Sequence, residues 1–236
     1  MKKSMLFLLL ISFSLFNYSQ DIIGAWESSY LSDTDDPLKS VVIIADGYKV
    51  LTTYNAKTGK FINTSGGSWR LEGDMMTEKV EFDSSNPERV GTESNFKVRI
   101  SKTEIEIIET GLTFKRLDNG SPGKLQGAWL MSGRIRDGKT QLRDTSRPRK
   151  TMKILSGTRF QWIAYNTETK EFKGTGGGTY TTVNGDYTEN IEFFSRDDSK
   201  SGLSLTFNFE LIDGNWHHTG LSSKGNPINE IWSVRE

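Results

Sequence analysis

The chain repeats itself in order along most of its length. The tripeptide Gly24-Ala25-Trp26 returns as Gly127-Ala128-Trp129. Four further segments return in the same order: 54–61 as 165–172, 65–69 as 176–180, 73–74 as 185–186, and 77–82 as 188–193. A tandem duplication explains this order, and two units of this size match whole domains better than the short stacked units of a solenoid.

The composition excludes several classes of function. The 236 residues include 30 basic and 30 acidic side chains, so no nucleic-acid partner is expected, because phosphate binding needs a surplus of Lys and Arg. Cysteine is absent, which removes disulfide, zinc–thiolate and thiol chemistry. A hydrophobic content of 34% together with 23 glycines is typical of a β protein with many turns.

The first twenty residues have the pattern of a signal peptide. A basic start, Met1-Lys2-Lys3, precedes a mostly apolar run over 6–16. That run is shorter than the ~20 residues that a transmembrane helix needs. The sequence therefore predicts a signal peptide over 1–20 and export to the periplasm or the outside medium, with no stable membrane insertion after cleavage. An uncleaved N-terminal anchor is the alternative.

Alternation of apolar and polar residues dominates the rest of the chain. In the clearest case Leu203, Leu205, Phe207, Phe209 and Leu211 alternate with polar side chains. The pairs Asp46-Gly47, Asn184-Gly185 and Asp213-Gly214 have the composition of tight hairpin turns. Consecutive antiparallel hairpins close most easily into up-and-down barrels, which leave no free sheet edge. The fold class expected is therefore all-β.

The repeat and the turn-rich segment 118–123 divide the chain. We expect a signal peptide at 1–20, a first barrel at 21–117, a linker at 118–123 and a second barrel at 124–236. Because the linker is short, the two barrels are expected to lie close together.

The Gly-x-Trp near the start of each unit carries a resemblance to a known superfamily. Trp26 opens the first unit, which ends on Phe114-Lys115-Arg116, and Trp129 opens the second, which ends on Trp232-Ser233-Val234-Arg235. This pattern resembles the calycin superfamily, the lipocalins and their relatives, and most of all the lipocalin-like domains of unknown function in exported bacterial proteins. The resemblance implies two tandem antiparallel lipocalin-like barrels. It also implies that Arg116 stacks on Trp26 and Arg235 on Trp129 to plug the closed ends.

The first unit departs from the second in length. It has no counterpart of the stretch 216–227. Its barrel is therefore expected to be smaller, less complete or without a cavity, and the second barrel is the better candidate for binding.

A glutamate recurs on what should be an inward strand face. Glu78 and Glu189 share a two-residue spacing with apolar residues, which are Val80 and Phe82 in the first unit and Tyr187, Ile191 and Phe193 in the second. A carboxylate inside an apolar barrel is costly unless it is paired. Each glutamate is therefore a polar anchor for a ligand, half of a structural ion pair or a residue at the open rim.

The second unit also carries both histidines and most aromatic residues. His217 and His218 face opposite ways on a strand, and His218 shares a face with Trp216. The residues expected to bind a ligand are Trp162, Tyr165, Tyr180, Glu189, Trp216 and His218. The alternative is an ordinary barrel core filled by side chains. No metal or cofactor site is expected, because no ligand spacing of the required kind is visible.

Two further patterns bear on the barrels. The glycine runs at 66–67 and 174–178 lack the Lys-Ser/Thr ending of a phosphate loop, so they favour strand bends or bulges. The segment after the first strand of the second unit is basic, with Arg134, Arg136, Lys139, Arg143, Arg147, Arg149 and Lys150. It would attract an anionic ligand, dock on the acidic residues Asp33, Asp35 and Asp36, or remain a solvated loop.

The favoured hypothesis is an exported, non-enzymatic protein that binds a small apolar or saccharide-like ligand in its second barrel. The first alternative is an interaction module with solid barrels, whose partner is a protein or a cell-surface polymer. The second alternative is an isomerase or hydrolase, for which Glu189 and His218 are the candidate catalytic residues.

Overall fold

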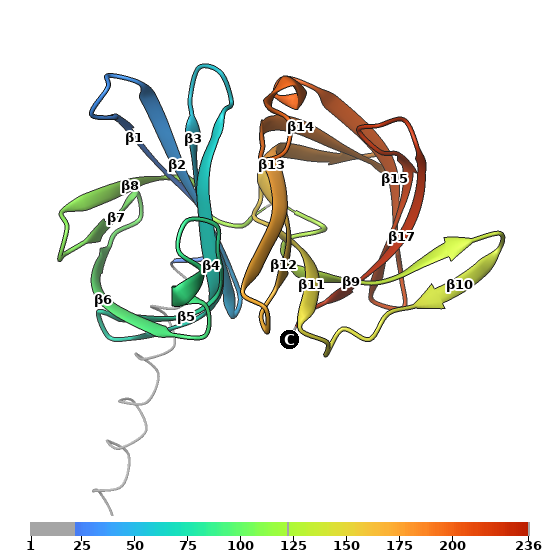
Figure 1. Ribbon diagram of the computed structural model, residues 1–236, viewed down its shortest axis with the longest axis horizontal. Helices are drawn as coiled ribbons and strands as arrows, with labels where there is room; N and C mark the ends of the chain where they lie inside the picture. Colours follow the sequence, from blue (N-terminus) through green and yellow to red (C-terminus); the bar gives the residue numbers. More distant parts are fainter. Residues whose placement is uncertain (1–21, 122, 236) are drawn as a thin grey trace, which may run out of the picture.

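The computed structural model describes residues 22–121 and 123–235, so the expected signal peptide lies outside the described residues. The described chain forms two antiparallel barrels that lie side by side (Figure 1). The fold class expected from the sequence is confirmed.

The first barrel is a closed meander of eight strands in sequence order, with β1 paired to β8. Its strands are β1 (Gly24–Leu31), β2 (Pro37–Ala45), β3 (Tyr48–Asn55), β4 (Phe61–Glu72), β5 (Met75–Asp83), β6 (Glu93–Ile100), β7 (Glu104–Ile107) and β8 (Leu112–Asp118). A single-turn 3₁₀ helix, η1 (Pro87–Arg89), follows β5. Although this unit is shorter than the second, its ring of strands is complete.

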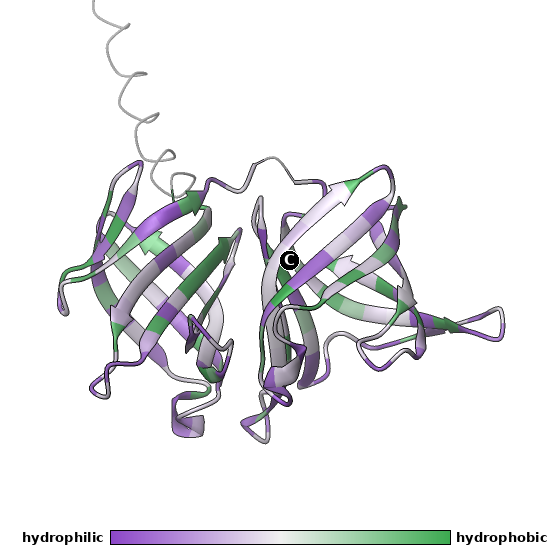
Figure 2. Cartoon of the chain, turned by 90° about the horizontal axis from the view of Figure 1, so that it is seen from above, coloured by the Kyte–Doolittle hydropathy of each residue, from purple (hydrophilic) through white to green (hydrophobic). Residues whose placement is uncertain are grey.

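The second barrel repeats this order and adds one short strand. Its wall consists of β9 (Gly127–Arg136), β11 (Arg149–Leu155), β12 (Arg159–Asn166), β13 (Glu171–Val183), β14 (Asp186–Phe194), β15 (Ser204–Ile212), β16 (Asn215–Leu221) and β17 (Pro227–Val234). Pairing of β9 with β17 closes the ring. The added strand β10 (Lys139–Leu142) pairs with the far end of β9, and this hairpin projects from the barrel (Figures 1 and 2).

The hairpin turns form where the sequence places them. Asp46-Gly47 joins β2 to β3, Asn184-Gly185 joins β13 to β14, and Asp213-Gly214 joins β15 to β16. Asn184 and Gly185 both have positive φ angles, 52° and 89°, which is the backbone that a tight two-residue hairpin requires.

The glycine runs mark a β-bulge in each barrel, as expected. The register of β4 and β5 shifts between Gly66 and Gly67, and that of β13 and β14 shifts between Gly177 and Gly178. A Cβ at Gly67 would lie 1.9 Å from the carbonyl oxygen of Lys79, and one at Gly178 would lie 2.0 Å from that of Asn190. Only glycine therefore allows the strands to approach at these points.

The bulges correct one expectation about which side chains face inward. Each inserts an extra residue, Glu81 in β5 and Glu192 in β14, and so reverses the alternation beyond it. Glu189 and Ile191 face the interior of the second barrel, but Phe193 turns outward toward the first barrel. Phe82 does the same in the first barrel.

The plug implied by the lipocalin resemblance is present in the first barrel. The guanidinium carbon of Arg116 lies 3.9 Å from the centre of a ring of Trp26, whose Nε1 donates to the Ile22 carbonyl oxygen at 2.9 Å. Arg116 also donates to the carbonyl oxygens of Ile23 and Lys102. The closed end is thus held by a cation–π contact and by backbone hydrogen bonds.

The corresponding plug of the second barrel was predicted wrongly. Trp129 is buried and donates to the Leu125 carbonyl oxygen at 2.8 Å, but Arg235 does not stack on it. Arg235 lies over the ring of Tyr48 in the first barrel instead. The spacing explains the difference. Arg116 follows Phe114 by two residues and shares its inward face, whereas Arg235 follows Trp232 by three and faces outward.

Where the barrels meet, they bury a common apolar core. The outer faces of β2, β3 and β5 pack against those of β11, β12 and β14 (Figure 1). Equivalent pairs recur: Tyr54 stacks on Phe193 with ring centroids 4.9 Å apart, and Tyr165 packs on Phe82 at 4.9 Å. Phe61 stacks on its own counterpart, Phe172. The two copies are therefore related by an approximate two-fold axis.

Polar groups at both ends of this interface join the barrels further. The Tyr54 hydroxyl donates to Glu192, and the Tyr165 hydroxyl donates to Glu81 at 2.6 Å. Arg159 Nη1 lies 2.5 Å from Glu192, and Arg235 Nη2 lies 2.7 and 2.8 Å from the two oxygens of Glu81. Each carboxylate thus accepts from one tyrosine and one arginine, which satisfies it away from bulk water.

The linker is tied to the second barrel by a single carboxylate. Asp118, at the end of β8, accepts from the backbone N–H groups of Gly120, Gly157 and Thr158 and from the hydroxyl of Ser156. Burial raises the pKa of Asp118, but hydrogen bonds from the hydroxyl of Thr158, the N–H of Gly120, the hydroxyl of Ser156 and the N–H of Gly157 outweigh it and hold the pKa below its ordinary value. The linker is therefore anchored at the turn between β11 and β12.

The buried tyrosines predict a loss of stability at alkaline pH. Burial, followed by nearby carboxylates, raises the pKa of Tyr54, Tyr165, Tyr180 and Tyr187 above the ordinary value. Their contribution to stability is complete below pH ~10, where the tyrosines of the unfolded chain begin to ionise, and is lost as pH rises further.

Ultraviolet difference spectra and circular dichroism across this range check the prediction. We expect these tyrosines to ionise in one cooperative step together with unfolding. Gradual ionisation of all tyrosines near pH ~10 in a chain that stays folded would contradict it.

Candidate functional site

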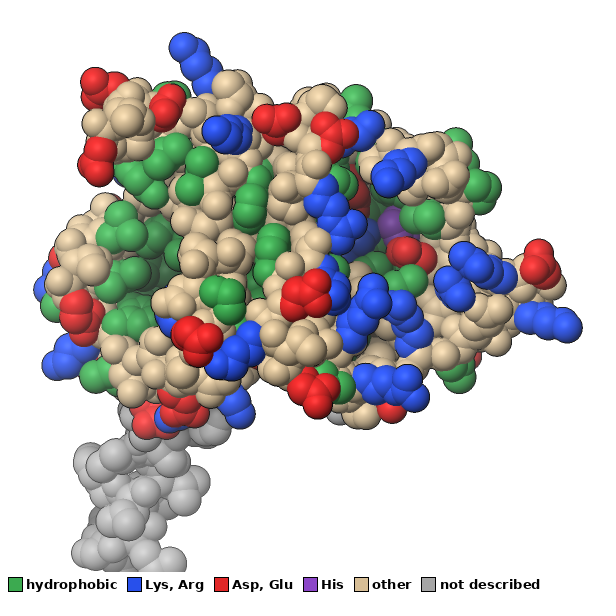
Figure 3. All heavy atoms as spheres, in the orientation of Figure 1, with side chains coloured by type: hydrophobic (Ala, Val, Ile, Leu, Met, Phe, Trp, Pro, Cys, Tyr) green, Lys and Arg blue, Asp and Glu red, His purple; other side chains and the backbone are tan. Residues whose placement is uncertain are grey.

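The interior of the second barrel is not filled by side chains. A cavity of about 220 Å³ opens among residues of six strands and the connection between β16 and β17. Its lining is Thr151, Lys153, Trp162, Glu189, Ile191, Phe194, Leu205, Phe207, His218, Ser222, Ser223, Ile228, Glu230 and Trp232. Lys and Arg side chains gather around a hollow on this barrel (Figure 3). The walls are mainly aromatic and aliphatic with a few charged groups, as in small-molecule pockets.

A buried ion pair lies in this cavity. Lys153 Nζ is 2.8 Å from Glu189 Oε1, and the two side chains are only 5% and 6% exposed. Four aromatic rings surround the ammonium, with centroids 4.8 to 5.9 Å away: Tyr187, Phe207, Trp216 and Trp232. The cation–π contacts and the carboxylate together compensate Lys153 for the loss of water.

The first barrel contains the same kind of pair, built differently. Lys49 Nζ lies 3.0 Å from Glu78 Oε1. The two glutamates occupy equivalent positions, but Lys49 comes from β3 whereas Lys153 comes from β11, the counterpart of β2. The structure thus places Glu78 and Glu189 in internal ion pairs, which was one of the three roles open from the sequence.

A second acidic group lies on the opposite wall of the cavity. Glu230 accepts from Trp232 Nε1 at 3.1 Å, and His218 Nδ1 lies 3.4 Å away. Burial and the positive charge of Lys153 lower the pKa of His218, so this imidazole is neutral at pH 7. Burial raises the pKa of Glu230, but the hydrogen bond to His218 and the charge of Lys153 outweigh it, so the carboxylate is ionised.

Three of the six residues expected to bind a ligand line this cavity, namely Trp162, Glu189 and His218. Trp216 packs behind the lining, with its ring near those of Trp129, His218 and Trp232. Tyr180 is buried elsewhere, and its hydroxyl donates to the Ser156 carbonyl oxygen at 2.6 Å.

Tyr165 lies outside the cavity, which corrects its expected place. It is three residues from Trp162 on β12, so strand alternation turns it to the outer face, where it packs against the first barrel. Strand alternation counted from Trp162 predicts this outward orientation of Tyr165 from the sequence alone.

Two charged residues of the cavity, Lys153 and Glu230, were not among the expected ones. Lys153 sits between Met152 and Ile154, and alternation across this apolar stretch marks a lysine on the face opposite them. That signal was present in the sequence. Glu230 gives no comparable signal, because its neighbours are of mixed polarity, a polar Asn229 on one side and an apolar Ile231 on the other.

The interior of the first barrel is much smaller and more apolar. Its cavity measures about 60 Å³ and is lined by aliphatic and aromatic side chains, with Lys49 as its charged residue. From the sequence, the first barrel was expected to be smaller, less complete or without a cavity. The structure shows a complete barrel with little internal space.

Within residues 22–121 and 123–235, no three His, Cys, Asp or Glu side chains are grouped so as to hold a metal ion. No helix in the described part of the chain is long and apolar enough to cross a membrane.

The fold and the cavity define a class of molecule, a tandem pair of antiparallel eight-stranded barrels with a polar–aromatic cavity in the second. No family model matches the chain, and no curated protein matches its sequence. Among solved structures, the chain is similar to the Cpx pathway activator NlpE from Escherichia coli. The match has 11% identity and a TM-score of 0.25 over 91% of this chain and 93% of that one. So weak a likeness carries no argument about function.

Proposed function

We propose that this protein is an exported binding protein that holds a small ligand in its second barrel. The observation that supports this most is the cavity of about 220 Å³ in which charged groups and aromatic rings converge. The first barrel, with about 60 Å³ of internal space, acts as a scaffold.

The charges in the cavity favour a saccharide-like ligand over a purely apolar one. Two carboxylates, Glu189 and Glu230, lie among aromatic walls, and Ser222 and Ser223 line the rim. An apolar ligand would strip water from these groups without replacing its hydrogen bonds, which is costly. A ring that carries hydroxyl groups would donate to the carboxylates and stack on Trp162 or Trp232.

The alternatives receive less support. The interaction module assumed two solid barrels, and the second barrel is hollow. An isomerase or hydrolase would use Glu189 or His218, but Glu189 is already held in an ion pair with Lys153.

Export is part of the proposal and rests on the sequence of residues 1–20. The chain recovered from its own host should lack these residues.

Replacing Trp162 with Ala should reduce ligand retention. Loss of the indole removes stacking worth about 1 kcal/mol and further apolar contact, so the affinity for the ligand should fall about ten-fold. Native mass spectrometry of the chain purified from its host measures the bound fraction, and the same spectra report whether residues 1–20 have been removed.

The matched control is Trp69→Ala in the first barrel, where the indole donates to the Ala45 carbonyl oxygen. This variant should keep the bound molecule. Equal retention in both variants would place the ligand elsewhere, and equal loss would indicate a general effect on folding.

A further inference from the structure

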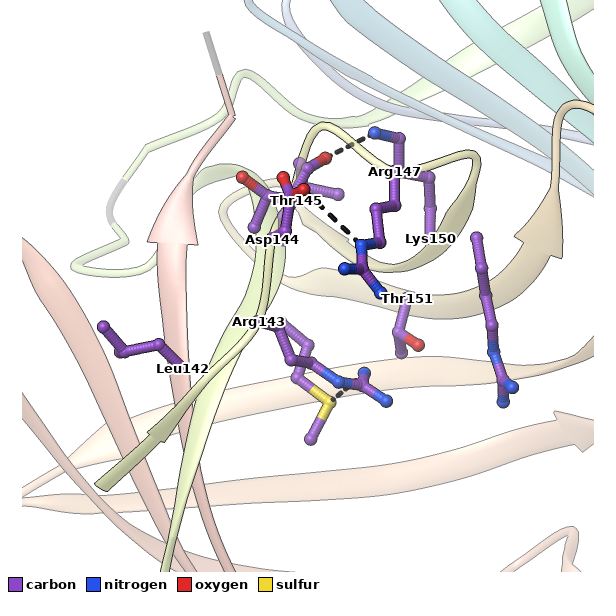
Figure 4. Close-up of a pocket in the computed structure, with 10 residues that line it drawn as sticks. Leu142, Arg143, Asp144, Thr145, Arg147, Lys150 and Thr151 are labelled. Carbon is purple, nitrogen blue, oxygen red and sulfur yellow. Dashed lines mark hydrogen bonds and ion pairs between the residues drawn. The ribbon is translucent and has the colours of Figure 1, made fainter. Parts of the chain in front are cut away.

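The wall of the second barrel has a gap beside the cavity. β9 pairs with β11 only from Gly127 to Leu130, and beyond that it pairs with β10. The first residues of β11, Arg149 to Thr151, pair only with β12. A pocket of about 340 Å³ opens in this gap, roofed by the segment that connects β10 to β11 (Figure 4).

The charge around this pocket is strongly unbalanced. Its lining includes four cations, Arg143, Arg147, Arg149 and Lys150, and one carboxylate, Asp144. The carboxylate is already engaged, because it accepts from the backbone and hydroxyl of Ser146 and lies 3.5 Å from Arg147 Nε.

Two of the guanidiniums have no acidic partner among the described residues. Arg143 Nη1 contacts the Met131 sulfur at 3.1 Å, a weak acceptor. The side chain of Arg149 makes no hydrogen bond or ion pair within the described part of the chain. Figure 4 shows Arg143, Arg147, Lys150 and Thr151 around one opening.

Lys150 is held by the segment that roofs the pocket. Its Nζ donates to the Thr145 carbonyl oxygen at 2.5 Å. Burial, and then the positive charge of Arg235, lower the pKa of Lys150, although Glu81 and Asp144 oppose the change.

From these observations we propose that the pocket binds a phosphate or sulfate group. The planar fork of a guanidinium matches the oxygen edge of such a group and can donate two hydrogen bonds to it. Two unpaired guanidiniums suit a group that carries about two negative charges near neutral pH. The acidic residues of the β1–β2 connection, on the far side of the first barrel in Figure 1, do not reach this site.

The group has two sources with the same chemistry, a free inorganic ion or an ester on a larger molecule. Thr151 lines both this pocket and the barrel cavity. An ester bound in the gap can therefore belong to a molecule whose ring lies inside the barrel. The site itself does not depend on that molecule.

The test is calorimetric titration of the mature chain with inorganic phosphate and with inorganic sulfate, at constant ionic strength set by sodium chloride. The variant Arg143→Gln/Arg149→Gln should bind at least about ten-fold more weakly than the unmodified chain, because it loses charge-assisted hydrogen bonds. The control Arg136→Gln/Lys139→Gln removes the same charge from the exposed β9–β10 hairpin and should change the affinity less than about two-fold.

Glucose 6-phosphate and glucose, titrated in parallel, distinguish the sources. Tighter binding of the ester than of phosphate indicates that the sugar ring contributes, and equal binding indicates a site for the free ion; both support the anion site. Equal weakening in the two double variants, or no binding of phosphate and sulfate to the unmodified chain, would overturn it. Trp162→Ala should leave phosphate binding intact, so failure of the ligand proposal and failure of this one are distinguishable.

Discussion

Replacing Arg235 with Leu is expected to lower the free energy of unfolding by about 3–5 kcal/mol, the largest effect at the interface between the barrels. Arg235 binds both oxygens of Glu81 and donates to the Tyr165 hydroxyl, and its side chain is only 9% exposed. Without it, Glu81 stays desolvated and has only Tyr165 as a partner.

Equilibrium unfolding in urea, followed by tryptophan fluorescence, measures this loss. The control is Arg99→Leu, which removes an exposed arginine paired with Glu106 on the first barrel and should cost less than about 1 kcal/mol. Similar small losses in both variants would show that the Arg235 pair does not hold the barrels together.

Breaking the ion pair inside the second barrel should be equally costly. Lys153→Met leaves Glu189 buried and without its partner, and we expect a loss of about 3–5 kcal/mol. The double variant Lys153→Met/Glu189→Leu removes both charges and keeps similar volumes. It should recover most of the loss, because neither charge then has to be desolvated.

A double-mutant cycle of the two single variants and the double variant checks this. Lys49→Met with Glu78→Leu supplies the matched cycle in the first barrel. If the double variant were as unstable as the sum of the single ones, the two residues would not act as a pair.

The all-β fold was predictable because many of the strands carry a local signal. Alternating apolar residues and Gly-containing turn pairs are local signals that span only a few positions. Because the sequence is duplicated, a signal in one unit can be compared with the equivalent segment of the other. The glycine runs likewise predicted the bulges at Gly67 and Gly178. The contact between Trp26 and Arg116 followed from the resemblance, because Arg116 keeps the spacing that turns it inward.

The errors arose where one residue changes which face a side chain occupies. The bulge residues Glu81 and Glu192 reverse the faces beyond them and send Phe82 and Phe193 to the interface. The extra residue before Arg235 sends it to Glu81 rather than to Trp129. A one-residue change in register moves a side chain to the other side of the sheet. An error of a single position in the sequence therefore places a side chain on the wrong face of the barrel wall.

The interface itself explains why the candidate site was only partly predicted. Strands β11 and β12 are buried on both faces, one toward the cavity and one toward the first barrel. Burial alone therefore does not separate Trp162, which lines the cavity, from Tyr165, which contacts the other barrel. The pairing of barrels is a long-range property that strand patterns do not encode.

A crystal structure of the protein purified from its own host tests whether the second barrel holds a ligand. We expect electron density for a small ring-shaped molecule in the second barrel, in contact with Trp162 and Glu230, and none in the first barrel. A second barrel closed by its own side chains, or a ligand held only in the first barrel, would contradict it.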